Sequence, residues 1–311
     1  IHYIISYVNN MKYYIILFFK GMAMGIANVI PGVSGGTIAL ITEIYEELIN
    51  SLKSFDKKAL SLIISLDFNG FKKHTNLYFL ITLFGGSIAS VFSIANLFEY
   101  LFLHYPILIW AFFFGLILSS IYFVGKRIKK WNINNIIALL IGTIIALSLS
   151  LVTPASENDN ILFVFICGII GVSGMMLPGL SGSFILILMG NYELLMVTAV
   201  TEINIILLSI FFLGSIFGLM SFSHILAWVF KHYKDTTLSL LTGFIMGSLS
   251  IIWPWKKIAE SIIVNGEEKV LSYRWYIPSE INQENILAVI LMALGIIAVY
   301  YIESIEKKNN K

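Results

Sequence analysis

Two short stretches of this sequence place proline, glycine and hydroxyl residues inside apolar surroundings. PGVSGGT begins at Pro31, and PGLSGS begins at Pro178. Proline lacks an amide hydrogen and ends the helix before it, and glycine adopts backbone conformations that other residues avoid. Serine is well placed to cap the helix that follows. Each stretch therefore predicts a helix N-terminus with free backbone amides, which attracts anions and phosphate above all.

The candidate site consists of these residues and one nearby cation. The predicted helix breaks are Pro31, Gly32, Pro178 and Gly179, and the predicted phosphate-binding residues are Lys20, Ser34, Gly35, Gly36, Thr37, Ser181, Gly182 and Ser183. Lys20 is expected to pair with the phosphate or with an acid, or to extend to the lipid headgroups if it lies near the inner face. The alternative for the two breaks is a pair of glycine kinks that serve only close helix packing. No catalytic residue, metal site or cofactor is predicted.

Two glutamates occupy equivalent positions beyond the breaks, Glu46 in EIYEE and Glu193 in GNYELL. A carboxylate at the same position of both segments is a candidate for proton coupling or for holding a partner helix. The alternative is that each marks a helix end at the membrane interface.

The composition indicates which elements must position these residues. Of 311 residues, 58% are hydrophobic and 12% are charged, whereas soluble domains carry about 25% charged residues. The net charge of +2 provides no basic field for nucleic acid. The single cysteine, Cys167, excludes an internal disulfide. The chain is therefore predicted to be a membrane protein, and a soluble enzyme and a nucleic-acid-binding protein are both excluded.

Six stretches approach the length of a spanning helix, which needs about 20 apolar residues. The predicted spans are 77–103, 107–125, 135–152, 203–230, 236–253 and 286–302. Regions 13–49 and 161–200 are also apolar, but Pro-Gly interrupts each of them, so we expect broken or re-entrant helix pairs there. Met11 is expected to be the initiator, with residues 1–10 upstream of it.

Loop charges predict the orientation through the positive-inside rule. Segments 50–76 and 126–134 are rich in lysine and are placed inside, as are both termini. Segment 153–160 has acids and no base, and 254–285 has more acids than bases, so both are placed outside. The predicted location is the cytoplasmic membrane, with multiple spans.

An internal duplication sets the predicted architecture. PGVSGGTIALITEIYE (31–46) and PGLSGSFILILMGNYE (178–193) match at 7 of 16 positions, at an offset of 147 residues. Further along, Gly86-Ser87-Ile88 matches Gly214-Ser215-Ile216 at an offset of 128, because the 50–76 loop lengthens the first copy. The repeats are 11–152 and 161–303, and together they form one integral membrane domain.

Each repeat contains a broken helix pair and three spans, so the second repeat must enter the membrane from the opposite face. We therefore expect an all-α polytopic membrane protein with an inverted-topology repeat, the plan of many secondary transporters. The alternative is a duplication with only structural meaning.

The two segments KGMAMGIANVIPGVSGGTIALITEIYEELI and SGMMLPGLSGSFILILMGNYELL resemble the paired signatures of the bacterial and archaeal polyprenyl-phosphate transporter family. The resemblance covers essentially the whole chain. It implies that the protein is not an enzyme and that it moves undecaprenyl phosphate, a lipid carrier of envelope glycan synthesis, from the outer leaflet to the cytoplasmic one. The implied partners are polyprenyl phosphate and membrane lipids, with no nucleic acid, and a homo-oligomer is left open.

Two other functions remain open at this stage. PGVSGG also resembles the Pro-Gly-x-Ser-Arg-Ser turn of undecaprenyl-pyrophosphate phosphatases, but Gly35 and Gly182 stand where that turn has its arginine. Without such a clamp, charge developing on a transferring phosphoryl group would lack support. An ion-coupled transporter of a small soluble anion would use the same helix ends.

Overall fold

The computed structural model describes residues 2–29, 34–152, 154–264, 267–279 and 282–309. The first half contains α1 (His2–Val29), α2 (Gly35–Ile41), α3 (Tyr45–Lys53), α4 (Lys57–Ile64), α5 (Phe68–His74), α6 (Leu77–His104), α7 (Pro106–Gly125) and α8 (Ile133–Leu149). The second half contains α9 (Ile161–Met176), α10 (Gly182–Leu188), the π-helix η1 (Leu194–Thr198), α11 (Ala199–Thr201), α12 (Ile205–His232), α13 (Lys234–Ser248), β1 (Lys256–Val264), β2 (Glu267–Trp275) and α14 (Gln283–Asn309).

Several helices have the length and composition of membrane spans. Within the described residues, three helices are by themselves long and apolar enough to cross a membrane: α7, α12 and the Gln283–Ser304 part of α14. A fourth candidate joins α5 to the first part of α6, with a bend of 66° between them. Helices α8 and α9 are apolar but shorter. This agrees with the predicted all-α membrane protein.

Local sequence signals explain where these helices begin. Pro106 occupies the first turn of α7, where its missing amide hydrogen leaves no intrahelical bond unmade. Asn132 caps α8, and Asn160 caps α9, because each side-chain oxygen accepts hydrogen bonds from first-turn amides.

Close backbone contacts at glycine join α1 to α6 and α9 to α12 in the same way. A Cβ atom on Gly21 would lie 2.1 Å from the Leu83 carbonyl oxygen, and one on Gly168 would lie 2.3 Å from the Phe211 carbonyl oxygen. Gly21 and Gly168 are 147 residues apart, and Leu83 and Phe211 are 128 apart. Both pairs therefore follow the two offsets of the duplication.

The remaining long helices pair across the two halves. Helix α7 packs on α14, and α8 packs on α13. A Cβ atom on Gly115 of α7 would lie 1.9 Å from the Met292 carbonyl oxygen. A Cβ atom on its counterpart in the duplication, Gly243 of α13, would lie 2.2 Å from the Leu139 carbonyl oxygen of α8. The helix before the last in each half thus packs on the last helix of the other half.

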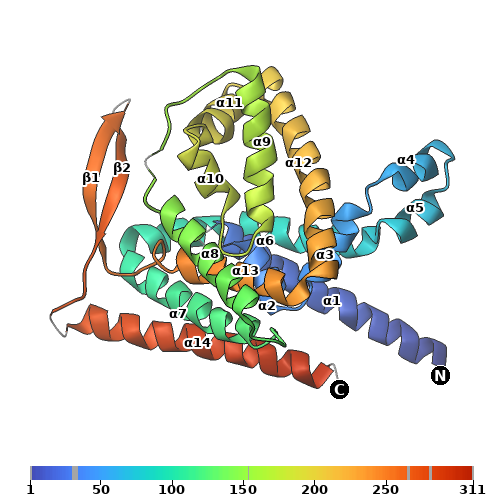
Figure 1. Cartoon of the computed structure of the whole chain (residues 1–311), viewed down its shortest axis with the longest axis horizontal. Coiled ribbons are helices and arrows are strands. Elements are labelled where there is room, and N and C mark those ends of the chain that lie inside the picture. The colour runs from blue at the N-terminus through green and yellow to red at the C-terminus, as the bar shows by residue number, and fades with distance from the viewer. Residues whose placement is uncertain (1, 30–33, 153, 265–266, 280–281, 310–311) are drawn as a thin grey trace.

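The structure adds a β-hairpin where the sequence analysis expected only an outside loop. Strands β1 and β2 pair antiparallel, with Lys256 opposite Trp275 and Lys257 opposite Arg274. The hairpin projects from one end of the molecule, while α4 and α5 project from the opposite end (Figure 1). The N-terminal end of α1 and the C-terminal end of α14 lie toward the α4–α5 side (Figure 1).

Candidate functional site

The first break opens into α2, and its amides already have acceptors. Ser34 is the N-cap of α2, and its Oγ accepts a hydrogen bond from the Gly36 amide at 3.1 Å. The Gly35 amide donates to Asn28 Oδ1 at 2.8 Å. The sequence predicted free amides here, but both of these amides already have hydrogen-bond acceptors. Pro31 and Gly32 lie outside the described residues.

The second break has different polar contacts. Helix α9 ends at Met176 and α10 begins at Gly182, so Pro178 and Gly179 lie in the interruption. Gly179 has a φ of +83°, a conformation that favours glycine. Ser181 occupies the N-cap position of α10, but its side chain makes no cap hydrogen bond. Instead, Ser181 Oγ lies 2.7 Å from Ser183 Oγ.

The two breaks are in direct contact, although they are far apart in the sequence. Ser34 Oγ donates to the Leu177 carbonyl oxygen at 3.2 Å, and the Gly179 amide donates to Thr37 Oγ1 at 2.9 Å. The Tyr45 hydroxyl donates to the Met176 carbonyl oxygen at 2.8 Å. Thr37 and Ser34 are buried. The hydroxyl groups of the first break thus satisfy backbone groups that the second break leaves outside helical bonding.

A cavity of about 120 Å³ lies beside the first break. Its lining includes the polar side chains of Asn28 and Ser87 and the backbone of Gly35 and Gly36. Most of the remaining lining residues are apolar. The lining comes from α1, α2, α3, α6, α9 and α12, so both halves of the chain contribute to it.

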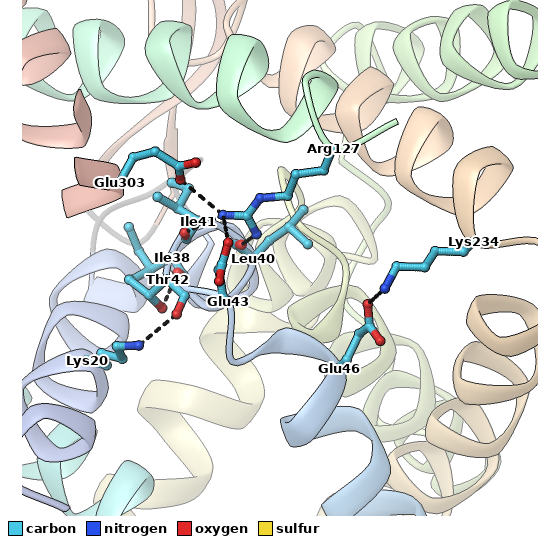
Figure 2. Close-up of polar contacts among 10 residues, drawn as sticks. All are labelled: Lys20, Ile38, Leu40, Ile41, Thr42, Glu43, Glu46, Arg127, Lys234 and Glu303. Carbon is cyan, nitrogen blue, oxygen red and sulfur yellow. Dashed lines mark hydrogen bonds and ion pairs between the residues drawn. The ribbon is translucent and has the colours of Figure 1, made fainter. Parts of the chain in front are cut away.

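Lys20 lies at the C-terminal end of α2, whereas Ser34 lies at its N-terminal end. The Lys20 ammonium donates to the Thr42 carbonyl oxygen at 2.8 Å (Figure 2). Thr42 is the C-cap residue of α2. A cation at this end compensates the negative end of the helix dipole. The structure therefore does not bring Lys20 together with the hydroxyl groups of the breaks.

Arg127 also holds this end of α2, and the sequence analysis did not select it. Its Nη1 donates to the Leu40 carbonyl oxygen at 2.7 Å, and its Nη2 donates to the Ile41 carbonyl oxygen at 3.0 Å. Nη2 also lies 3.1 Å from Glu43 and 3.2 Å from Glu303, which is buried (Figure 2). A guanidinium presents several donors in one plane, which suits this combination of acceptors. The available signal was a single arginine among the lysines of 126–134.

With this geometry described, comparison with known proteins identifies the family. Residues 24–270 match the family described as undecaprenyl phosphate translocase-like. The chain belongs to this family.

Two relatives of this chain have names that state a substrate. A polyprenyl-phosphate transporter of Vibrio cholerae is 38% identical over 302 residues, which cover 95% of this chain and 98% of the relative. A polyprenyl-phosphate transporter of Staphylococcus aureus is 31% identical over 253 residues, which cover 76% of this chain and 84% of the relative. No solved structure matches the chain. The predicted resemblance is confirmed at the level of the family.

The two equivalent glutamates, Glu46 and Glu193, have different surroundings. Glu46 is half-exposed at the start of α3 and forms an ion pair with Lys234 of α13 (Figure 2). Glu193 is partly buried and directly precedes η1. Among the residues that the structure describes, no group of three or more His, Cys, Asp or Glu side chains could hold a metal ion.

Proposed function

We propose that this protein transports a polyprenyl phosphate across the membrane, and that undecaprenyl phosphate moves from the outer leaflet to the cytoplasmic one. The observation that carries this proposal is the direct contact between the two helix breaks, beside a cavity that both halves line. Polar, non-helical backbone at membrane depth is tolerated where it is buried in protein or lines a cavity. The names of the two relatives support the choice of substrate.

The second break offers the better phosphate site. The hydroxyl groups of Ser181 and Ser183 form a hydrogen bond with each other, and the Ser181 side chain does not cap α10. Both hydroxyls can rotate to donate to a phosphate oxygen, with the Gly182 backbone beside them. Ser34 and Thr37 hold the two breaks together, and the Gly35 and Gly36 amides donate to Asn28 and Ser34. These four residues would join the site once those hydrogen bonds open.

Serine substitutions should separate binding from stability. Ser181→Ala and Ser183→Ala should each weaken binding of undecaprenyl phosphate by roughly ten- to hundredfold, because a hydrogen bond to a charged group contributes about 1.5–3 kcal/mol. Ser34→Ala removes a helix cap and should instead lower the free energy of unfolding by about 0.5–2 kcal/mol. Lipid binding to purified protein and thermal unfolding measure the two effects. Wild-type binding by both Ser181→Ala and Ser183→Ala would remove the second break from the site.

The inverted arrangement of the halves is part of this proposal. The reciprocal pairing of α7 with α14 and of α8 with α13 is what a two-fold relation between the halves would produce. The opposite placement of α4–α5 and of the β-hairpin supports a cytoplasmic side for the first and an outer side for the second (Figure 1). Cysteines introduced at Lys129 and Glu157 should therefore react with impermeant reagents from opposite faces. Labelling of both from one face would refute the inverted topology.

The decisive experiment is transport by the purified protein in proteoliposomes. Labelled undecaprenyl phosphate should change leaflets at a rate far above that of protein-free vesicles. Undecaprenyl pyrophosphate, the control, should release no inorganic phosphate; sustained release that depends on a metal would establish a phosphatase instead.

Parallel assays of Glu46→Gln and Glu193→Gln at two pH values test proton coupling, because a coupling carboxylate predicts loss of pH dependence with lipid binding intact. Transport of a small soluble anion in place of the lipid would overturn the substrate assignment.

A further inference from the structure

Helices α4 and α5 form an arm that has no counterpart among the described residues of the second half. The arm accounts for the drop in the repeat offset from 147 to 128 residues. Its exposed apolar side chains are Leu60, Ile63, Ile64, Leu66 and Phe68. Four lysines accompany them: Lys57, Lys58, Lys72 and Lys73. An apolar face together with basic residues is typical of helices that lie at a membrane surface with acidic headgroups.

Specific polar contacts fix the shape of the arm. Asp56 caps α4 by accepting hydrogen bonds from the Lys58 and Ala59 amides at 2.9 and 3.0 Å. It also lies 3.0 Å from His74 Nε2, at the end of α5. The bond from the Ala59 amide, followed by the contact with His74, lowers the pKa of the Asp56 carboxyl. Through these contacts the Asp56 carboxylate links the start of α4 to the end of α5.

A groove of about 520 Å³ separates this arm from α12. On the arm, its lining includes the apolar side chains of Leu60, Ile63 and Phe71, together with the charged residues Asp56 and Lys57. On α12, the groove is lined by Met220 and His224. Helix α12 has the length and composition of a membrane span, and most of the groove lining is apolar, so we expect a largely apolar occupant.

The inner end of the groove lies next to the cavity at the first break. Leu52 of α3 and Leu219 of α12 line that cavity. Phe55, just beyond α3, and Met220, the next residue of α12, line the groove. Neighbouring residues of α12 and of the end of α3 thus line the groove and the cavity, which places the groove beside the cavity that contains Gly35 and Gly36.

We propose that the groove between the arm and α12 holds the prenyl chain of the transported lipid while the phosphate occupies the helix breaks. This inference rests on the proposed function and identifies the chain, and not only the headgroup, as a recognised part of the substrate. An isoprenoid chain needs no hydrogen-bond partners, which matches the leucine, isoleucine and phenylalanine side chains of the lining. The position of the groove beside the break cavity favours this chain over the acyl chain of a bystander phospholipid.

A tryptophan in the groove tests the proposal. Ile63→Trp places a larger ring among the lining residues, and Ile64→Trp is its matched control, because the neighbouring Ile64 is 73% exposed and is not among the lining residues. Transport of undecaprenyl phosphate should fall about tenfold in Ile63→Trp, since each chain methylene excluded from the groove forfeits burial free energy. Transport of farnesyl phosphate, whose chain is much shorter, should change little. Ile64→Trp should transport both lipids at the wild-type rate.

Each other outcome has a distinct meaning. Equal loss of both lipids in Ile63→Trp, or wild-type transport of both, would overturn the assignment of the groove to the prenyl chain. An effect that follows the phosphatidylglycerol content of the vesicles, and not chain length, would assign the groove to a phospholipid. If the wild-type protein transports neither prenyl phosphate, it is the proposed function that fails. A cysteine at Ile63, tested for protection from a maleimide by undecaprenyl phosphate, gives an independent binding measurement, and lack of protection would also contradict the proposal.

Discussion

Replacing Gly179 with alanine is expected to abolish transport and to lower the free energy of unfolding substantially. The φ of +83° at this position costs a residue with a side chain about 1–3 kcal/mol. In addition, a Cβ atom would lie 2.6 Å from the carbonyl carbon and oxygen of Phe244 in α13. These are backbone atoms of a packed helix and cannot rotate away. The break would have to shift, and the hydrogen bond from the Gly179 amide to Thr37 would be lost with it.

Gly85→Ala is the matched control for this substitution. A Cβ atom at Gly85, within α6, would meet no atom within 4 Å. Alanine is favoured over glycine in a helix by about 1 kcal/mol, so this variant should be as stable as the wild type or slightly more stable. Thermal unfolding in detergent and transport in proteoliposomes compare the two variants. If Gly179→Ala matched Gly85→Ala in both measurements, the left-handed turn at the second break would be dispensable.

Replacing Arg127 with methionine should have the next largest effect, a loss of about 3–5 kcal/mol in the free energy of unfolding. Methionine preserves the apolar part of the side chain but removes every donor. The two carbonyl groups at the end of α2 and the buried Glu303 carboxylate would all lose the guanidinium. Because α2 begins at the first break, a shift of its other end should also slow transport.

Two further variants show whether the effect belongs to the contacts of Arg127. Arg127→Lys should recover only part of the stability, since an ammonium cannot reproduce the planar donor arrangement. The double variant Arg127→Met with Glu303→Met should lose less than the sum of the single losses, because it removes a charge together with its partner. Additive losses in chemical denaturation would show that the ion pair contributes no coupling energy.

The positions of the breaks could be predicted because their causes are local. Proline and glycine act on their own backbone, and helix α9 ends one residue before the Leu177-Pro178 pair. The duplication also carries geometric information that the sequence analysis used only in part. The glycines at the helix contacts recur at its offsets, and this recurrence predicts equivalent contacts in the two halves.

Other features could not be predicted because they depend on distant partners. The end of α2 is held by Lys20 from α1 and by Arg127 from the loop after α7, and nothing in the local sequence of α2 specifies either side chain. The hairpin is a different case, since Asn265-Gly266 between two apolar-rich segments is a strong two-residue hairpin signal. The prediction of an outside loop at 254–285 rested on the charges of that segment alone, and charge carries no information about strand pairing.

The reciprocal packing of α7 on α14 and of α8 on α13 constrains how the chain can be made. Ribosomes deliver α7 and α8 to the bilayer before most of the second half exists, so both helices must wait there with their glycine faces uncovered. Gly115 meets Met292 only after α14 has been synthesised. The first half therefore cannot complete its own packing, and the whole protein reaches its final packing only after the last helix, α14, has been added. A ribosome that stalls before α14 would leave α7 exposing a membrane-embedded face to quality-control proteases.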